Sequence, residues 1–113
     1  MTSFEPGDIV SVDYPHVETH EFKRRPALVV TTHALGPNGI VFWVMMITSA
    51  VNRGWPGDLM VENHPSAGLP IPSVVRTEKI TTLESKGAEK VGRVSDALLA
   101  QVRVRLALHL GVS

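Results

Sequence analysis

Residues 26–47 read PALVVTTHALGPNGIVFWVMMI, two almost continuously apolar runs separated by a polar, turn-forming segment. Apolar runs of this length that are rich in valine and isoleucine are typical of buried strands. Between them, Gly36-Pro37-Asn38-Gly39 supplies two glycines and an asparagine, residues that adopt positive φ angles at low cost. We therefore predict two strands, over 26–32 and 40–47, the first of them central in the sheet.

Shorter apolar segments on either side of this pair predict further strands. They cover residues 9–14, 58–62, 73–77 continuing as 79–83 with a bend near Glu78, and 90–94. Pro15 cannot donate to a ladder, so we expect it to end the first strand and to start a polar loop over 16–23. The order predicts a sheet of short antiparallel strands.

One segment is convincingly helical. Ser95 is a suitable N-cap, Asp96 follows at the positive end of the helix dipole, and Gly111 can stop the helix. Leucine and valine repeat on one face between these ends, and His109 in the last turn suits the dipole. The predicted fold is mainly β: a single domain over residues 1–113, with a small barrel of antiparallel strands and a C-terminal α-helix.

Composition narrows the function. The 113 residues are 43 % apolar, contain no cysteine and carry 11 basic and 11 acidic side chains. Proteins that coat long duplex nucleic acid usually have a basic excess, so charge balance favours at most a short local groove. No signal peptide is evident, and the longest apolar run, residues 40–47, is too short for a membrane span. We expect a cytoplasmic protein without membrane attachment, metal or cofactor.

Polar side chains mark the ends of both central strands. Lys23, Arg24 and Arg25 precede the first, and Thr48 and Ser49 follow the second. A guanidinium can bind a phosphate through two hydrogen bonds, and a hydroxyl can donate to a phosphoryl oxygen. The pattern predicts a site for a phosphodiester. The alternative is that the arginines are solvated charges and that Thr48 merely starts a turn.

Six blocks along the chain resemble, in the same order, those of the MazF/PemK toxins of bacterial toxin–antitoxin systems. The blocks are Gly7-Asp8-Ile9-Val10, Arg25-Pro26-Ala27-Leu28-Val29-Val30, Ile47-Thr48-Ser49, Ala67-Gly68-Leu69, Ser73-Val74-Val75-Arg76 and Gly92-Arg93-Val94. The resemblance implies an SH3-like barrel, a homodimer and metal-independent cleavage of single-stranded RNA at short motifs. It also implies neutralisation by a separate antitoxin protein. The gyrase-inhibiting CcdB toxins share this fold, so a non-enzymatic inhibitor is the alternative function.

The resemblance also implies catalytic roles. Arg25 matches the catalytic arginine of the family, and Thr48 matches the threonine that donates to the phosphoryl group. For the base, two alternatives remain: the pair His20-Glu21, or Glu78 with Arg76 as acid or clamp. The alternative is that none of these residues is catalytic: His20 and Glu21 are exposed loop residues, and Arg76 and Glu78 form a surface pair across strands.

Further residues are candidates for RNA binding. They are Lys23, Arg24, Ser49, Arg53 and Trp55. Trp55 lies in a glycine- and proline-containing loop beside Arg53, where it could stack on a base or instead pack the loop. Trp43 lies within an apolar strand and is expected in the core or in the dimer interface.

Overall fold

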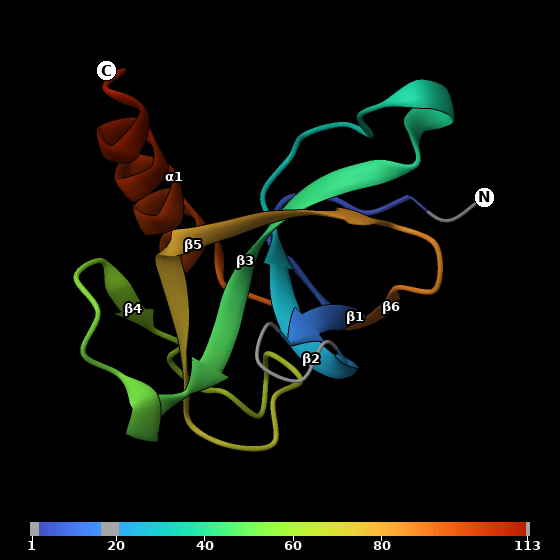
Figure 1. Ribbon diagram of the computed structural model, residues 1–113. Helices are drawn as coiled ribbons and strands as arrows, with labels where there is room; N and C mark the ends of the chain where they lie inside the picture. The colour runs from blue at the N-terminus through green and yellow to red at the C-terminus, as the bar shows by residue number, and fades with distance from the viewer. Residues whose placement is uncertain (1–2, 17–20, 113) are drawn as a thin grey trace.

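The predicted central pair lies inside a sheet of six strands in the order β4-β5-β3-β2-β1-β6, with antiparallel neighbours. The computed structural model describes residues 3–16 and 21–112. Its strands are β1 (Asp8–His16), β2 (Glu21–Val29), β3 (Val41–Ser49), β4 (Asp58–Met60), β5 (Ser73–Glu84) and β6 (Glu89–Arg93) (Figure 1). Two 3₁₀ turns, η1 (Pro37–Gly39) and η2 (Ala50–Asn52), flank β3, and helix α1 (Asp96–Leu110) follows. The mainly β fold with a C-terminal helix is confirmed.

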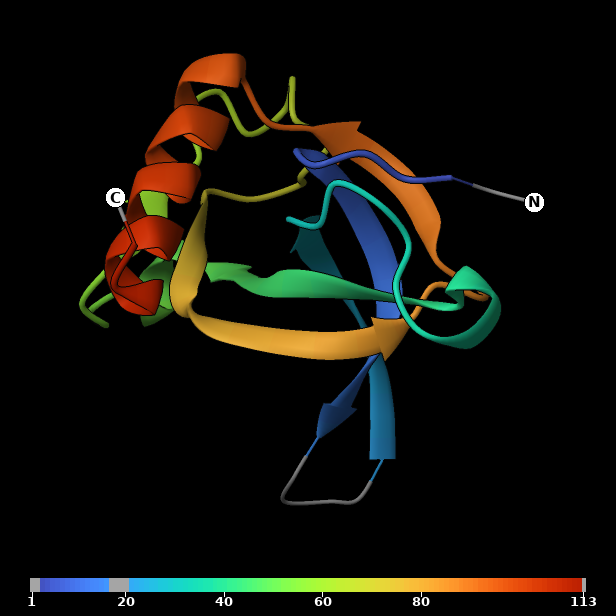
Figure 2. The same ribbon diagram turned by 90° about the horizontal axis from the view of Figure 1, so that it is seen from above.

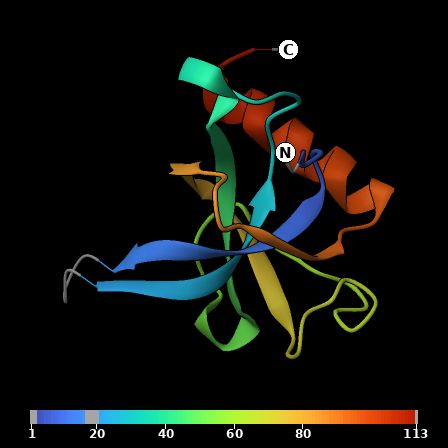
Figure 3. The ribbon, with the colours of Figure 1, turned by 90° about the vertical axis from the view of Figure 1, so that its right-hand side faces the viewer.

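The first hairpin is longer than predicted. β1 continues through Pro15, which lies opposite Phe22, and residues 21–25 belong to β2 instead of a loop. At this end β2 is the only sheet neighbour of β1 among the described residues, because the pairing of β1 with β6 stops at Ser11. A strand edge tolerates proline, since no further ladder needs its missing N–H. The outer half of this hairpin consequently projects from the rest of the sheet (Figures 2 and 3).

The predicted bend in β5 is confirmed. Met46 lies opposite Arg76, whereas the preceding Met45 lies opposite Ile80, so residues 77–79 form a bulge. A bulge of this kind bends a strand and increases its twist. Beyond the bulge, β5 changes direction (Figure 1) and continues to pair with the first half of β3. There Thr81 Oγ1 lies 2.6 Å from Tyr14 Oη, a hydrogen bond that joins β5 to β1, two strands that are not neighbours in the sheet.

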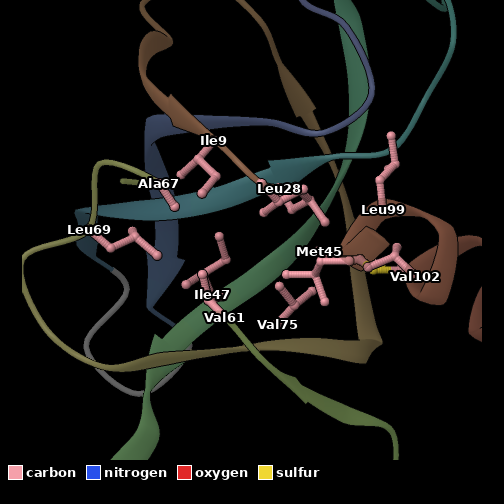
Figure 4. Close-up of a cluster of buried hydrophobic side chains, with 12 residues drawn as sticks. Ile9, Leu28, Met45, Ile47, Val61, Ala67, Leu69, Val75, Leu99 and Val102 are labelled. Atoms are coloured by element: carbon pink, nitrogen blue, oxygen red, sulfur yellow. The ribbon is translucent and has the colours of Figure 1, made fainter. Parts of the chain in front are cut away.

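Helix α1 begins and ends as predicted. The Leu98 N–H donates to Ser95 Oγ at 3.1 Å, and Gly111 has a φ of 70° in the left-handed region. Leu98, Leu99 and Val102 are buried in a cluster formed with the sheet (Figure 4). His109 lies in the last turn, and its Nε2 is 3.2 Å from the buried Thr77 Oγ1 in the β5 bulge. The helix therefore packs through its first half, and His109 links its end to the bulge.

Two of the glycines in the blocks shared with the toxin family lie against each other's backbone. A Cβ on Gly92 would lie 1.7 Å from the Ala67 carbonyl oxygen, and one on Gly68 would lie 2.0 Å from that of Val91. Backbone atoms cannot move aside as a side chain can. We expect Gly92→Ala to lower the free energy of unfolding by about 2–3 kcal/mol, measured by urea denaturation.

Gly87→Ala is the matched control, because Gly87 has a φ of +80° and no atom lies within 4 Å of the position that a Cβ would take there. This variant introduces conformational strain without a steric clash, and we expect it to lower the free energy of unfolding by about 1 kcal/mol. Equal losses in the two variants would contradict the close backbone contact.

Candidate active site

Arg25 and Thr48 lie just beyond the point where the pairing of β2 with β3 ends. β2 and β3 pair at Val29↔Val44, Leu28↔Met45 and Ala27↔Met46. The ladder stops at Pro26, which has no N–H to donate. Arg25 and Thr48 each lie two residues beyond the last pair, Ala27↔Met46, so the same register, if it continued past this point, would set them opposite each other. The structure therefore brings the two principal predicted residues to the point where β2 and β3 separate.

The two side chains also share one face of the sheet. Side chains alternate along a strand, so Arg25 shares the face of Ala27 and Val29, and Thr48 that of Val44 and Met46. These four apolar residues belong to or pack against a second buried cluster. Its buried members are Val10, Val12, Tyr14, Ala27, Val29, Phe42 and Val44. Arg25, half-buried and opposite Val12, and Thr48, which is 8 % exposed, thus lie at the edge of this cluster.

The end of β3 is held by the turn that follows it. Asn52 Nδ2 donates to Thr48 Oγ1 at 3.1 Å. Ser49 Oγ accepts from the Val51 N–H at 3.3 Å and so caps η2. Arg53, exposed at the end of this turn, donates from Nη1 to the Ala50 carbonyl at 2.9 Å. Two predicted RNA-binding residues, Ser49 and Arg53, thus have structural contacts beside Thr48.

Arg76 is buried and forms a pair with Asp58. Its side chain donates from Nε to Asp58 Oδ1 at 3.1 Å and from Nη2 to Oδ2 at 3.0 Å. Nη2 also donates to the Asn52 carbonyl at 2.8 Å. Only 7 % of Arg76 is exposed, and Glu78 lies exposed in the β5 bulge, so the interpretation of a surface pair between these two residues is wrong.

Asp58 also shapes the loop before it. Its Oδ2 accepts from the N–H groups of Gly54 and Trp55, each at 3.3 Å. The hydrogen bonds from Arg76 hold the pKa of Asp58 below its ordinary value of 3.8, with help from these amides and against the effect of burial. Neither Asp58 nor Asn52 was predicted from the sequence as a site residue. An aspartate three residues after Trp55 in a glycine-rich turn is a signal for such side-chain-to-backbone bonds.

Of the two alternatives for Trp55, the structure shows the one in which the ring packs its loop, and stacking on a base stays a prediction. The Arg76 Cζ lies 4.5 Å from the centre of its ring, a cation–π contact that anchors the loop. The side chain nevertheless remains 46 % exposed. Trp55 is thus a fixed aromatic surface beside the buried Arg76.

Arg24 lies apart from Arg25. Neighbouring residues of a strand face opposite sides, and Arg24 donates to the carbonyl oxygens of Ser11 at 3.0 Å and Gly87 at 3.1 Å. It also lies 3.6 Å from the carboxylates of Asp13 and Glu89. The side chains of Arg24 and Arg25 therefore lie on opposite sides of β2.

Three predicted residues have no described side chain. His20 lies outside the described residues, and for Glu21 and Lys23 the structure describes only the backbone of β2, opposite His16 and Tyr14. Across residues 3–16 and 21–112, no three His, Asp or Glu side chains gather as a metal site would. In the same part of the chain, no helix has the length and apolar character needed to cross a membrane.

A hollow of about 680 Å³ lies elsewhere, between the segment before β1, the loop before β3 and the β5–β6 turn. Phe4, Thr31, His33, Phe42 and Lys86 are among the residues that line it. None of the predicted site residues does, so the candidate site is not this hollow.

Six antiparallel strands followed by a C-terminal helix define a class of small, mainly β proteins. Residues 5–110 match the model of the family described as PemK-like, MazF-like toxin of type II toxin–antitoxin system. The chain belongs to this family.

Solved structures agree with this assignment. A chain in the crystal structure of MazE–MazF from Deinococcus radiodurans is 25 % identical, with a TM-score of 0.77 and all of both chains covered. MazF alone from that organism is 26 % identical, with a TM-score of 0.73 over 99 % of this chain and 100 % of that one. An endoribonuclease in complex with its cognate antitoxin, from a mycobacterial species, shares the fold at 20 % identity, with a TM-score of 0.74 over 98 % of each chain. No curated protein sequence matches.

Proposed function

We propose that this protein is a cytoplasmic endoribonuclease toxin that cleaves single-stranded RNA at short sequence motifs without a metal. The products would carry 2′,3′-cyclic phosphate and 5′-hydroxyl ends. The observation that supports the proposal is that Arg25 and Thr48 both lie two residues past the end of the β2–β3 pairing, on strand faces that carry members of one apolar cluster. Family membership supports the same activity.

In this reaction the RNA supplies its own nucleophile. The 2′-oxygen attacks the adjacent phosphorus and loses its proton to a base, while the bond from phosphorus to the 5′-oxygen breaks and that oxygen gains a proton. Negative charge develops on the non-bridging oxygens. The Arg25 guanidinium stabilises this charge through forked hydrogen bonds, and the Thr48 hydroxyl donates to one of the same oxygens.

The proton-transfer roles fall to the remaining candidates. Glu78, exposed in the bulge, and the pair His20-Glu21 are the alternatives for the base. For Arg76 the contacts favour the role of a clamp over that of an acid, because Nε and Nη2 are already bonded to Asp58 and Asn52. Its buried position keeps the turn beside Thr48 in place.

The RNA would extend from the Arg25–Thr48 pair over the neighbouring loop. Lys23, Ser49, Arg53 and Trp55 are the proposed binding residues, whereas Arg24 is engaged on the other side of β2 by Ser11 and Gly87. Trp55 is the best supported of them, because its ring lies against Arg76 and its backbone N–H is bonded to Asp58, yet the side chain is nearly half exposed. Stacking on an aromatic ring is tolerant of base identity and suits a single strand.

Trp55→Ala is expected to raise KM for a single-stranded RNA about tenfold, with kcat changed less than about twofold, because one stacked base contributes about 1–3 kcal/mol. Trp55→Phe keeps an aromatic face and should lie closer to the wild type. Initial rates across a range of RNA concentrations measure both constants. If Trp55→Ala left KM unchanged while lowering stability, the ring would be only a loop anchor.

Two protein partners belong to the proposal. The first is a cognate antitoxin, as in the mycobacterial complex with the same fold. The second is another copy of this chain. Trp43 is 42 % exposed, so of its two predicted places, the core and the dimer interface, the core is wrong. Ile80 on the adjoining strand β5 is exposed on the same face. Large apolar side chains that are exposed in one chain often mark a surface that binds another protein. We propose that a second copy of this chain binds there and forms a homodimer.

The test is incubation with a long single-stranded RNA in excess EDTA, followed by chemical mapping of the fragment ends. Discrete cuts with 5′-hydroxyl and 2′,3′-cyclic phosphate ends are expected. Cleavage that stops in EDTA would overturn the metal-independent mechanism. No cleavage by a folded preparation would overturn the enzyme and direct attention to gyrase inhibition.

A further inference from the structure

Thr48 has a partner whose chemistry limits what its hydroxyl can do. Asn52 Nδ2 donates to Thr48 Oγ1 at 3.1 Å, so the amide occupies one of the two lone pairs of that oxygen. The single proton of the hydroxyl is not used by this bond. Among the described residues, Asn52 is the only side chain hydrogen-bonded to Thr48 Oγ1. The Thr48 proton is therefore available to an acceptor supplied by a ligand.

Asn52 is itself held through its backbone. Its carbonyl oxygen accepts from Arg76 Nη2 at 2.8 Å, and Arg76 is fixed by two hydrogen bonds to Asp58. Asn52 also closes η2, whose first turn is capped by Ser49. The anchored backbone holds the Cα of Asn52 in place, so that its side chain needs to adopt only one rotamer to reach Thr48 Oγ1.

We propose that Asn52 is a positioning residue that fixes the Thr48 hydroxyl as a donor toward a phosphoryl oxygen of bound RNA. This inference rests on the proposed ribonuclease function. Without the amide, the Thr48 hydroxyl is free to rotate and to accept as well as donate. A donor that must be oriented during the reaction stabilises the developing charge less than a preorganised one.

The inference differs from a simple structural role for Asn52. If Asn52 only held η2, its loss would affect RNA binding and stability whether or not Thr48 had a hydroxyl. If it acts through Thr48, its loss should matter only while that hydroxyl is present. A double-mutant cycle separates the two cases.

The experiment measures kcat and KM for RNA cleavage in EDTA for Asn52→Ala, Thr48→Val and the double variant. We expect Thr48→Val to lower kcat about 100-fold. Asn52→Ala should lower kcat about tenfold in the wild-type background, with KM changed less than about twofold, and by less than about twofold in the Thr48→Val background. Thr48→Ser, which keeps the hydroxyl, should restore the effect of Asn52→Ala.

Asn52→Asp is a second variant of almost the same size, for the case in which Asn52→Ala disturbs the turn. An ionised carboxylate can only accept hydrogen bonds, so the Thr48 hydroxyl would donate its hydrogen bond to the introduced carboxylate and not to the RNA. Its added charge acts in both backgrounds, and we expect a larger loss of kcat in the wild-type background than in the Thr48→Val background. Val51→Ala, in the same turn and at a highly exposed side chain, is the matched control and should match the wild type.

The outcomes separate the two proposals. Equal losses from Asn52→Ala in both backgrounds, while wild-type protein cleaves RNA in an Arg25-dependent way, would overturn the positioning role and leave the ribonuclease intact. A folded wild-type protein that cleaves no RNA would overturn both.

Discussion

Arg25→Ala is expected to lower kcat for RNA cleavage by about 10²–10³-fold, the usual result of removing one preorganised stabiliser of transition-state charge. Arg25 lies two residues beyond the last β2–β3 pair, opposite Val12 of β1, and strand alternation places it on the same face as Ala27 and Val29. The measurement is the initial rate of cleavage of a defined single-stranded RNA in EDTA. The free energy of unfolding should change little, since Arg25 is only half-buried at the edge of the core.

Two further variants make this result specific. Arg25→Lys keeps the charge but loses the forked geometry, and we expect an intermediate rate. Arg103→Ala removes an exposed arginine from helix α1 and should cleave like the wild type. If Arg25→Ala and Arg103→Ala had the same rate, Arg25 would have no role in the chemistry.

Asp58→Ala is expected to lower the free energy of unfolding by about 3 kcal/mol at pH 7. The change leaves the Arg76 guanidinium buried without its carboxylate, and breaking a buried pair from one side typically costs about 3–5 kcal/mol. The N–H groups of Gly54 and Trp55 lose their acceptor as well. Urea denaturation followed by circular dichroism measures the loss.

A matched variant, Asp13→Ala, removes an exposed carboxylate that lies 3.6 Å from Arg24. Exposed pairs contribute at most about 1 kcal/mol, so this variant should be almost as stable as the wild type. Equal stability of Asp58→Ala and the wild type would contradict the buried pair.

The same pair predicts how stability depends on pH. The pKa of Asp58 is lowered from 3.8 chiefly by its hydrogen bonds to Arg76. Well above 3.8 both the folded and the unfolded carboxyl are ionised, and the stabilisation is complete. As the pH drops below 3.8 the unfolded state binds the proton first, so stability falls until the pH has passed the lower, folded pKa.

Asp8 contributes to the same acid range. Burial alone would raise its pKa, but hydrogen bonds from the Glu5 N–H, Lys90 and Arg93 together hold it below 3.8. We therefore expect Asp58→Asn to reduce the dependence of stability on pH below about 4 without abolishing it. An unchanged pH dependence in Asp58→Asn would show that Asp58 titrates alike in the two states.

The sequence by itself determined the order of the strands, the bend near Glu78 and both ends of helix α1, but it placed the strand over 26–32 where β2 covers Glu21–Val29. Apolar alternation, proline, glycine and the Ser95 cap act over a few neighbouring residues, so they can be read without the fold. Arg25 and Thr48 were recognised as site residues for a similar reason, because they lie next to the strongest strands and within blocks shared with a toxin family.

Only the tertiary structure decided which polar groups meet. Asp58 and Arg76 are 18 residues apart, and they pair because β4 lies beside β5 in this register. Trp43 is 42 % exposed although Met45 and Ile47, further along the same face of β3, are buried, because the elements that cover these two residues do not extend over Trp43. Asn52 reaches Thr48 because η2 turns the chain back directly after β3. Contacts of this kind depend on how distant elements pack, which no local pattern encodes.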